Sequence, residues 1–195
     1  MAFVPDLPIE TARLNLRAFT RGDVDAVFAY RQRDDVAQFL FDEPMSRESC
    51  AEAVQARTVQ TSWHQTGDKL LLAVERRHDR AMIGEVSLIL RNEVAGQGEL
   101  GYIINPDCHG QGYATEAAMG LLRVGFEIAG LHRIYARCDA RNASSYRVME
   151  RLGMRREAHF REHALFKGVW DEEMIYAMLE DEWAALSVGA QLSRA

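Results

Sequence analysis

Several stretches of the chain alternate between hydrophobic and polar residues, which is the period-two pattern of a strand with one buried face. The alternation is clear in residues 12–19, where Leu14 and Leu16 are flanked by polar side chains. Strongly apolar runs follow at residues 69–76 and 82–90, and turn residues separate them. The strands predicted from these patterns are residues 12–19, 69–76, 82–90, 99–104, 133–138, 158–166 and 172–179, the last two joined by a turn at residues 167–168.

Other stretches carry apolar residues three and four positions apart, which predicts helices that pack by one face. The clearest is residues 114–129, where Leu121, Leu122 and Phe126 fall on one side. Ser46 is a suitable N-cap for a helix that should run to about residue 64, before a glycine. The predicted helices are residues 23–30, 34–40, 46–64, 114–129, 142–152 and 180–186, and residues 187–195 are expected to form a loose tail.

The order of these elements predicts a mixed α/β domain. Three strands between residues 69 and 104 are joined by short turns, so they should form an antiparallel meander. The strand, helix and strand between residues 99 and 138 form a crossover unit, which places its two strands parallel. A chain of 195 residues that is 48% hydrophobic suits one domain over residues 1–195, with a core of about residues 11–183.

Composition and charge narrow the function. A formal net charge of −6 argues against extensive nucleic-acid binding. No apolar run approaches the roughly 20 residues that span a membrane, and no signal peptide is visible at the start. The cysteines, Cys50, Cys108 and Cys138, are widely separated, which favours reduced thiols and a cytoplasmic protein.

A glycine loop stands between the predicted strand 99–104 and the helix that begins near residue 114. Residues 109–116 read His-Gly-Gln-Gly-Tyr-Ala-Thr-Glu. The first turn of a helix presents N–H groups without intrahelical partners, and glycines let a ligand approach them closely, so the loop suits a phosphate or pyrophosphate. The chain has no Walker pattern, which needs Gly-x-x-x-x-Gly-Lys-Ser/Thr, and the loop departs from the dinucleotide fingerprint because Thr115 stands in place of the third glycine. On the loop alone, a plain turn and an anion site remain open.

A second motif supports the anion site. Residues 142–153 fit the spacing Asn-x-x-Ser-x-x-Val-x-Glu-x-x-Gly. Together, the two motifs resemble the acetyl-CoA-binding core of the GNAT acyltransferase superfamily, and more closely its RimJ/RimL-like branch of N-acetyltransferases. The resemblance extends over residues 11–183. His109 stands where the family loop has Gln or Arg, which leaves one side-chain contact to acetyl-CoA open.

The resemblance implies a single-domain GNAT fold with a mixed, mostly antiparallel sheet of six or seven strands, splayed at its centre and covered by helices on both faces. It implies acetyl-CoA as cosubstrate and no metal. Pantetheine would lie along Tyr102, Ile103 and Ile104, with a backbone N–H of that strand binding the oxyanion, and beside Asn142. The loop residues that would hold the pyrophosphate are His109, Gly110, Gln111, Gly112, Tyr113, Ala114 and Thr115.

The catalytic groups are less constrained by the sequence. Many GNAT enzymes protonate the leaving thiolate with a tyrosine seven residues after the motif asparagine, and this chain has Met149 there. The RimJ/RimL-like branch carries a serine at the place of Ser145, whose hydroxyl would contact the cofactor sulfur or bond local backbone instead. Glu99 is the first candidate base for the acceptor ammonium, and Glu85 and Glu162 are alternatives to it.

The predicted function is transfer of an acetyl group to a primary amine by direct attack in a ternary complex. A protein or peptide N-terminal α-amine is the first candidate acceptor, and a small amine such as an amino acid, polyamine or antibiotic is the second. A homodimer is compatible with the resemblance. A non-catalytic CoA-binding sensor is the alternative from another class, because of Met149. Asp42, Glu43, Glu48 and Glu52 could meet a cationic substrate or form a solvated face.

One short stretch points to a different class of enzyme. His159-Phe-Arg-Glu162-His163 matches the His-x-x-Glu-His pattern of some zinc hydrolases. On a helix, both histidines would share one face and could bind zinc. Because the stretch is expected to form a strand, a structural or acceptor-lining role is favoured over a metal site.

Overall fold

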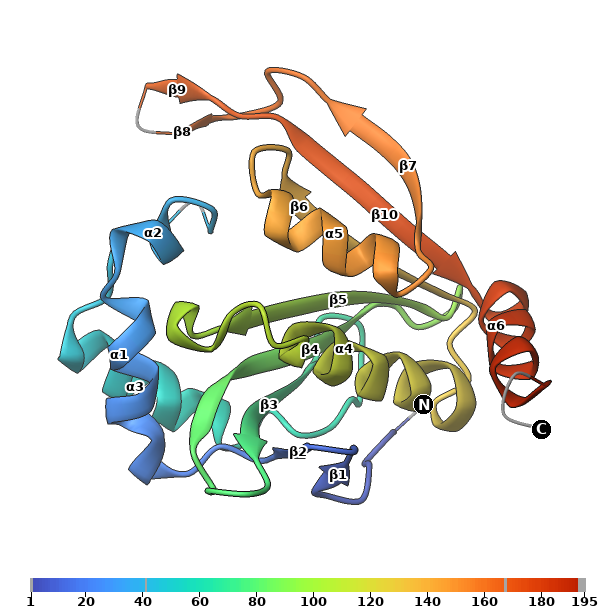
Figure 1. Cartoon of the computed structure of the whole chain (residues 1–195), viewed down its shortest axis with the longest axis horizontal. Helices are drawn as coiled ribbons and strands as arrows, with labels where there is room; N and C mark the ends of the chain where they lie inside the picture. The colour runs from blue at the N-terminus through green and yellow to red at the C-terminus, as the bar shows by residue number, and fades with distance from the viewer. Residues whose placement is uncertain (1, 41, 167, 193–195) are drawn as a thin grey trace.

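The computed structural model describes residues 2–40, 42–166 and 168–192 of the chain (Figure 1). Ten strands are described: β1 Ile9–Glu10, β2 Leu14–Arg17, β3 Lys69–Arg76, β4 Met82–Asn92, β5 Gln97–Ile104, β6 Arg133–Asp139, β7 Arg155–Phe160, β8 Leu165–Phe166, β9 Val169–Trp170 and β10 Glu173–Leu179. The helical elements are η1 Arg21–Asp23, α1 Val24–Arg31, α2 Asp34–Ala37, α3 Arg47–Arg57, η2 Pro106–Cys108, α4 Tyr113–Arg123, η3 Val124–Ile128, α5 Ala143–Arg151 and α6 Glu180–Leu192.

Eight strands form one sheet in the order β1-β2-β3-β4-β5-β6-β10-β7, and β8 and β9 form a separate hairpin. The meander β3-β4-β5 is antiparallel and the pair β5-β6 is parallel, as the sequence predicts. The remaining neighbours in the large sheet pair antiparallel. The sheet exceeds the predicted six or seven strands because the short edge strand β1 adds to it.

The sheet opens between β5 and β6. Their parallel pairing starts at Gln97 and Arg133 and ends at Leu100 and Ala136. Beyond that point, β5 continues to Ile104 on β4, and β6 continues on β10. The two central strands therefore diverge, which confirms the predicted splay and leaves backbone groups of β5 without a strand partner on one side.

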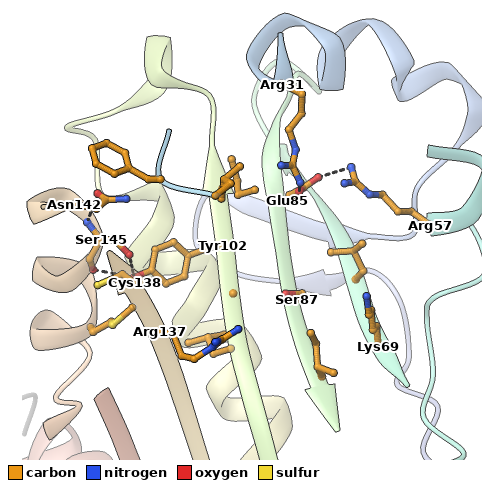
Figure 2. A pocket seen from close by; sticks show the side chains of 18 residues that line it. Arg31, Arg57, Lys69, Glu85, Ser87, Tyr102, Arg137, Cys138, Asn142 and Ser145 are labelled. Carbon is orange, nitrogen blue, oxygen red and sulfur yellow. Dashed lines mark hydrogen bonds and ion pairs between the residues drawn. The ribbon is translucent and has the colours of Figure 1, made fainter. Parts of the chain in front are cut away.

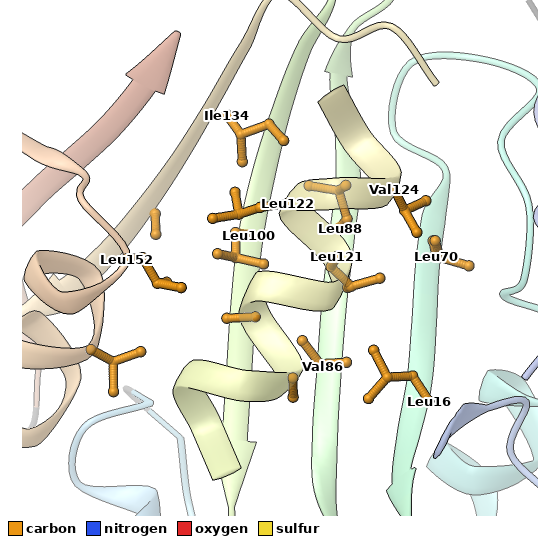
Figure 3. Packing of buried hydrophobic residues seen from close by; sticks show 14 of the residues in the cluster. Leu16, Leu70, Val86, Leu88, Leu100, Leu121, Leu122, Val124, Ile134 and Leu152 are labelled. Carbon is orange, nitrogen blue, oxygen red and sulfur yellow. The ribbon is translucent and has the colours of Figure 1, made fainter. Parts of the chain in front are cut away.

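Helices cover both faces of the sheet. On one face, α4 and α5 pack their apolar sides on a large core that includes Leu88, Leu121 and Ile134 (Figure 3). On the other face, α1 and α3 enclose a smaller core around Tyr30 and Val54. Strand β3 serves both cores, because Leu70, Leu72 and Val74 point to the first and Leu71 and Ala73 to the second.

The predicted helix over residues 46–64 is too long. Ser46 does cap it, with its side chain accepting from the Ser49 N–H, but α3 ends at Arg57. A turn at residues 58–59 follows, and two single bridges come after it, Phe3 with Trp63 and Thr61 with Leu70. Trp63 is buried in the large core and donates from its indole Nε1 to the Leu88 carbonyl at 3.0 Å. Burial of this tryptophan at the sheet outweighs the helical pattern.

Two predictions near the C-terminus are also wrong. The expected strand 158–166 divides, because β7 ends at Phe160, Glu162 adopts a positive φ of 49° and β8 begins at Leu165. Of the two predicted turn residues, Lys167 lies outside the described residues, and Gly168 has a φ of 77°. The helix expected over residues 180–186 continues to Leu192, so most of the expected tail is helical, and residues 193–195 lie outside the described part of the chain.

Candidate active site

The glycine loop presents a row of free backbone donors. Gly110 and Gly112 have φ angles of 76° and 78°, which an L side chain rarely adopts, and Gly112 is the N-cap of α4. The first helical bond is from the Glu116 N–H to the Gly112 carbonyl at 3.0 Å. Among the described residues, the N–H groups of residues 110–115 have no acceptor. The loop therefore offers an anion several donors and the positive end of a helix.

The segment between β1 and β2 holds this loop in place. The Glu116 carboxylate accepts from Thr11 Oγ1 at 2.6 Å, from the Arg13 N–H at 2.7 Å and from Arg13 Nε at 2.6 Å. Arg13 also donates to the Gln111 carbonyl at 2.9 Å, and its guanidinium lies over the Tyr113 ring. Burial would raise the pKa of Glu116, but the bonds from Thr11 and Arg13 outweigh it and lower the pKa.

His109 fastens the loop to the end of β5. Its Nε2 lies 2.8 Å from the Ile104 carbonyl, so that nitrogen carries the proton. The His109 N–H also donates to the Pro106 carbonyl at 3.0 Å. His109, which stands where the family has Gln or Arg, therefore has a local structural role, because it connects β5 to the glycine loop.

The end of β5 exposes backbone groups to the splay. The Asn105 N–H donates to Ile83 on β4 at 2.8 Å, so Ile103, two residues earlier, also faces β4. Tyr102 and Ile104 alternate with these residues along the strand, so their backbone N–H and C=O groups face the opposite side, toward the gap left by β6. The bond from His109 to the Ile104 carbonyl agrees with this orientation. Tyr102 therefore presents an N–H where the sheet opens.

Three side chains meet at the mouth of the splay (Figure 2). The Tyr102 hydroxyl lies 3.1 Å from Ser145 Oγ and donates to the Ser145 carbonyl at 2.9 Å. Burial raises the pKa of Tyr102 far above its usual range, so the phenol stays protonated. Burial also raises the pKa of the neighbouring Cys138 to about 11, although Ser145 partly opposes it, so Cys138 remains a thiol. The cluster holds hydroxyl donors and no thiolate nucleophile.

Asn142 occupies the N-cap of α5. Its Oδ1 accepts from the Ser145 N–H at 3.1 Å and from Ser144 Oγ at 2.7 Å. Its Nδ2 makes no hydrogen bond to the described residues and lies at the wall of the cavities described next. The amide is therefore oriented by its oxygen, and its N–H₂ group is left to donate to a ligand.

Two cavities lie on either side of the splay and share Tyr102, Ile103, Asn142 and Ser145 in their walls. The first, which we call the cofactor cavity, has a volume of about 660 Å³ and extends along α5 to the loop residues Gly110, Gly112 and Thr115. The second, the acceptor cavity, has a volume of about 340 Å³ and lies on the face covered by α1 and α3. A group bound in one cavity can thus reach a group bound in the other at Tyr102 and Ser145.

A buried carboxylate with two arginines lies in the acceptor cavity. Glu85 on β4 is 4% exposed. Its Oε1 accepts from Arg31 at 2.6 Å, and its Oε2 accepts from Arg57 at 2.6 Å and from the Tyr30 hydroxyl at 3.0 Å. Burial raises the pKa of Tyr30, so its hydroxyl remains a donor to Glu85. The sequence gives no sign of this cluster apart from Glu85, because single arginines in polar helices look like surface charges.

Glu99 does not line either cavity. Its Oε2 accepts from Arg91 at 2.6 Å and from the Tyr135 hydroxyl at 3.1 Å, and its Oε1 accepts from Arg137 at 3.0 Å. Burial would raise the pKa of Glu99, but Arg137 and Arg91 together lower it. A carboxylate bound in this way is a poor proton acceptor, so this geometry favours a structural role.

The other acidic and metal-binding candidates also lie apart from the cavities. Asp42, Glu43, Glu48 and Glu52 do not line them. The His-x-x-Glu-His stretch is not helical, since His159 lies in β7 and its Nε2 is 2.7 Å from the Glu172 carboxylate. Within residues 2–40, 42–166 and 168–192, no cluster of histidine, cysteine or carboxylate side chains could hold a metal ion.

Comparison with known proteins identifies the family. The Acetyltransferase (GNAT) domain family matches residues 13–155. The chain belongs to the GNAT acetyltransferases. It is 34% identical to the uncharacterized N-acetyltransferase YnaD of Bacillus subtilis over 90% of this chain and 98% of that protein. A GNAT-family acetyltransferase structure from Bacillus anthracis superimposes with a TM-score of 0.79 at 30% identity, covering 92% of this chain and 99% of the other.

A third relative is a provisionally assigned ribosomal-protein-serine acetyltransferase from Vibrio cholerae, with a TM-score of 0.73 at 25% identity over 90% of this chain and 99% of the other. These findings confirm the GNAT fold, an acetyl-CoA-dependent N-acetyltransferase activity and acetyl-CoA as cosubstrate. No helix in the described part of the chain is long and apolar enough to span a membrane.

Proposed function

We propose that this GNAT enzyme acetylates an α-amine, with an amine in the acceptor cavity attacking acetyl-CoA directly at the splay. The observation that carries this proposal is the contact of the two cavities at Tyr102 and Ser145. In this arrangement, the loop N–H groups of residues 110–115 hold the pyrophosphate. The Asn142 Nδ2 donates to the pantetheine arm, and the end of β5 aligns the thioester beside the gap.

The chemical steps follow from this placement. The amine nitrogen forms a bond to the thioester carbonyl carbon, and the carbonyl oxygen becomes an oxyanion that the Tyr102 N–H stabilises. The C–S bond then breaks. The Ser145 hydroxyl gives its proton to the departing thiolate, and the proton that the attacking nitrogen loses returns to Ser145 Oγ, so that an amide and the CoA thiol are formed. The Tyr102 hydroxyl, which donates to the Ser145 carbonyl, lies 3.1 Å from Ser145 Oγ and so holds the serine side chain at this point. In this proposal, the hydroxyls of Ser145 and Tyr102 perform the role of the family tyrosine, because this chain has Met149 at that position.

The acceptor is a protein or peptide N-terminus in the first form of this proposal. Its support is the resemblance to the RimJ/RimL-like branch and the name of the Vibrio cholerae relative with 25% identity. A small amine is the second candidate. The spermidine N(1)-acetyltransferase of Vibrio cholerae is 23% identical over 88% of this chain. The excess of arginine and lysine in the acceptor cavity disfavours a polycation such as spermidine here.

The test is a panel of amines and short peptides offered with acetyl-CoA, read by release of the free CoA thiol. We expect turnover with at least one α-amine, with the acetyl group located on that amine by mass spectrometry. Binding of acetyl-CoA without turnover of any member would favour the CoA-binding sensor instead. A burst of acetyl transfer to the protein itself would contradict direct attack.

A further inference from the structure

The acceptor cavity carries more positive than negative charge. Of the described residues in its wall, the cationic ones are Arg31, Arg57, Lys69 and Arg137, and Glu85 is the acidic one. Arg137 is already paired, with Glu99 at 3.0 Å and Glu173 at 3.2 Å. The surplus therefore lies around Glu85, where one carboxylate faces two guanidinium groups.

These charges are largely removed from water. The exposed side-chain fractions are 12% for Arg31, 11% for Arg57 and 5% for Glu85. A buried ion is costly unless it is paired, and one carboxylate cannot neutralise two guanidinium groups. If the arginines served only to neutralise Glu85, one of them would be enough. The negative charge of Glu85 therefore does not explain why a second arginine is buried beside it.

The hydrogen bonds of the cluster are also incomplete. An arginine has five N–H donors, and among the described residues Arg31 and Arg57 each use one of them in a hydrogen bond. The Nε of Arg31 is buried and has no described acceptor. A buried donor without an acceptor is costly in a native protein. The arginine pair thus has both charge and donors available for a ligand.

Lys69 extends this positive region along the same face of the sheet. It begins β3, two residues before Leu71, so both side chains point toward the acceptor cavity. Its ammonium has no ion pair with the described residues. Figure 2 shows Lys69 near Ser87, with Arg31 and Arg57 farther along on Glu85.

We propose that the acceptor cavity selects an amine that also carries an anionic group, a carboxylate in the simplest case, and that Arg31 and Arg57 bind that group. This inference rests on the proposed function and adds the substrate class. The register places Glu85 opposite Ile103, next to the Tyr102 that lines the splay. An anion on the arginines therefore leaves the amine of the same molecule directed at the thioester. Arginine forks suit carboxylates because they can bind both oxygens.

The primary test uses three acceptors of equal length: glycine, glycinamide and ethylenediamine. We expect kcat/KM for the acid to exceed that for the amide by about tenfold or more, a factor that roughly 1.4 kcal/mol provides, with the diamine lowest. Arg57→Gln should bring the acid-to-amide ratio close to one, and Arg57→Lys should retain much of it. Arg47→Gln is the matched control, because Arg47 lies on the same helix outside the cavity.

A second arm distinguishes a free amino acid from a peptide as the source of the anion. Peptides that start with serine and have aspartate, asparagine or lysine at the second position differ only in that charge. Preference for the aspartate peptide over glycine identifies an acidic N-terminus, and the reverse order identifies a small amino acid. Lys69→Gln provides a further variant at an exposed side chain if Arg57→Gln does not fold.

Binding must be read separately from turnover, so that this inference and the proposed function can fail independently. Calorimetry on the CoA-loaded protein compares N-acetylglycine with its amide, and tighter binding of the acid supports the inference even without catalysis. Equal binding of acid and amide, or tightest binding of the diamine, overturns it. If amines are acetylated with no preference for the acid, the proposed function stands and this inference is wrong. If the acid binds best and no amine is acetylated, this inference stands and the proposed function is wrong.

Discussion

Gly84 is the position where a single methyl group should disturb both the fold and the cofactor site. It lies on β4 opposite Ile104 of β5, at the strand end that borders the splay. A Cβ atom built on Gly84 would lie 2.3 Å from the Ile103 carbonyl oxygen and 2.9 Å from both Cα and Cδ1 of Ile104. Two of these three atoms belong to the backbone, so they cannot move away by rotating a side chain.

The magnitude follows from that geometry. Inserting a methyl group into a packed site typically costs about 1–3 kcal/mol, and backbone contacts of this kind place Gly84→Ala at or above the upper end. For a chain of this length, a loss of about 3 kcal/mol lowers Tm by roughly 6–12 °C. If β5 moves to relieve the contact, Ile103 and Ile104 leave the position where they would align pantetheine. We therefore also expect weaker acetyl-CoA binding in the folded variant.

The assay is a thermal melt combined with calorimetric titration of acetyl-CoA. Gly22→Ala is the control, because its Cβ would meet only Thr20 Oγ1, at an ordinary 3.6 Å. The control should melt and bind like the wild type. A Gly84→Ala protein with unchanged Tm and unchanged acetyl-CoA affinity would refute both the packing of β4 on β5 and the role of this strand end.

Three further predictions concern the site. Glu116→Gln should lower the free energy of unfolding by about 1–3 kcal/mol near neutral pH. Because the pKa of Glu116 is lowered in the folded protein, the difference in stability from wild type in denaturant melts should shrink as the pH falls below the ordinary glutamate pKa near 4.5. Gly112→Val, at a φ of 78°, should weaken acetyl-CoA binding by about tenfold or more in calorimetry. Ser145→Ala should lower kcat by roughly 10-fold to 100-fold with acetyl-CoA binding nearly intact, and Tyr102→Phe should add little to this loss in the double variant. A fully additive loss would show that Tyr102 does not act through Ser145.

The phosphate loop could be predicted from the sequence because its determinants are local. Gly110 and Gly112 are needed for positive φ, and the helix after them begins where its apolar spacing begins. The crossover from β5 to β6 follows from element order alone. The contact of Tyr102 with Ser145 could not be predicted, since 43 positions separate them and the contact depends on how far the sheet opens.

The charge of the acceptor cavity could not be predicted from the sequence either, because it also depends on contacts between distant elements. Arg31 and Arg57 stand in polar stretches, where the usual arginine is solvated, and their burial arises only when α1 and α3 close over β4. For the acidic residues between the first strands, the sequence left a cationic substrate and a solvated face open, and the structure places arginines in the cavity wall. Trp63 is a similar case, because the helical pattern around it in the sequence gives no indication of its hydrogen bond to Leu88 in the sheet.

The positive cavity also bears on how the acceptor loses its proton. Glu99 is bound by two arginines, and Glu85 likewise, so neither carboxylate is well placed to accept one. Nearby cations disfavour the ammonium form and lower the pKa of a bound amine, which for an α-amine is about 8 in water. With an anion on Arg31 and Arg57, the ammonium of Lys69 still keeps the cavity positive. A bound α-amine would then be largely neutral near physiological pH without a dedicated base.

This argument predicts that the ionisation of the acceptor alone sets the rising limb of the pH profile. Glu99→Gln should give kcat/KM values parallel to wild type between about pH 6 and 9, with any loss appearing in Tm instead. Replacing the acceptor by an amine of lower pKa should shift the limb to lower pH in both proteins by the same amount. A variant that loses activity only at the acid end would instead show that Glu99 takes the proton and that its ion pairs with Arg91 and Arg137 open during turnover.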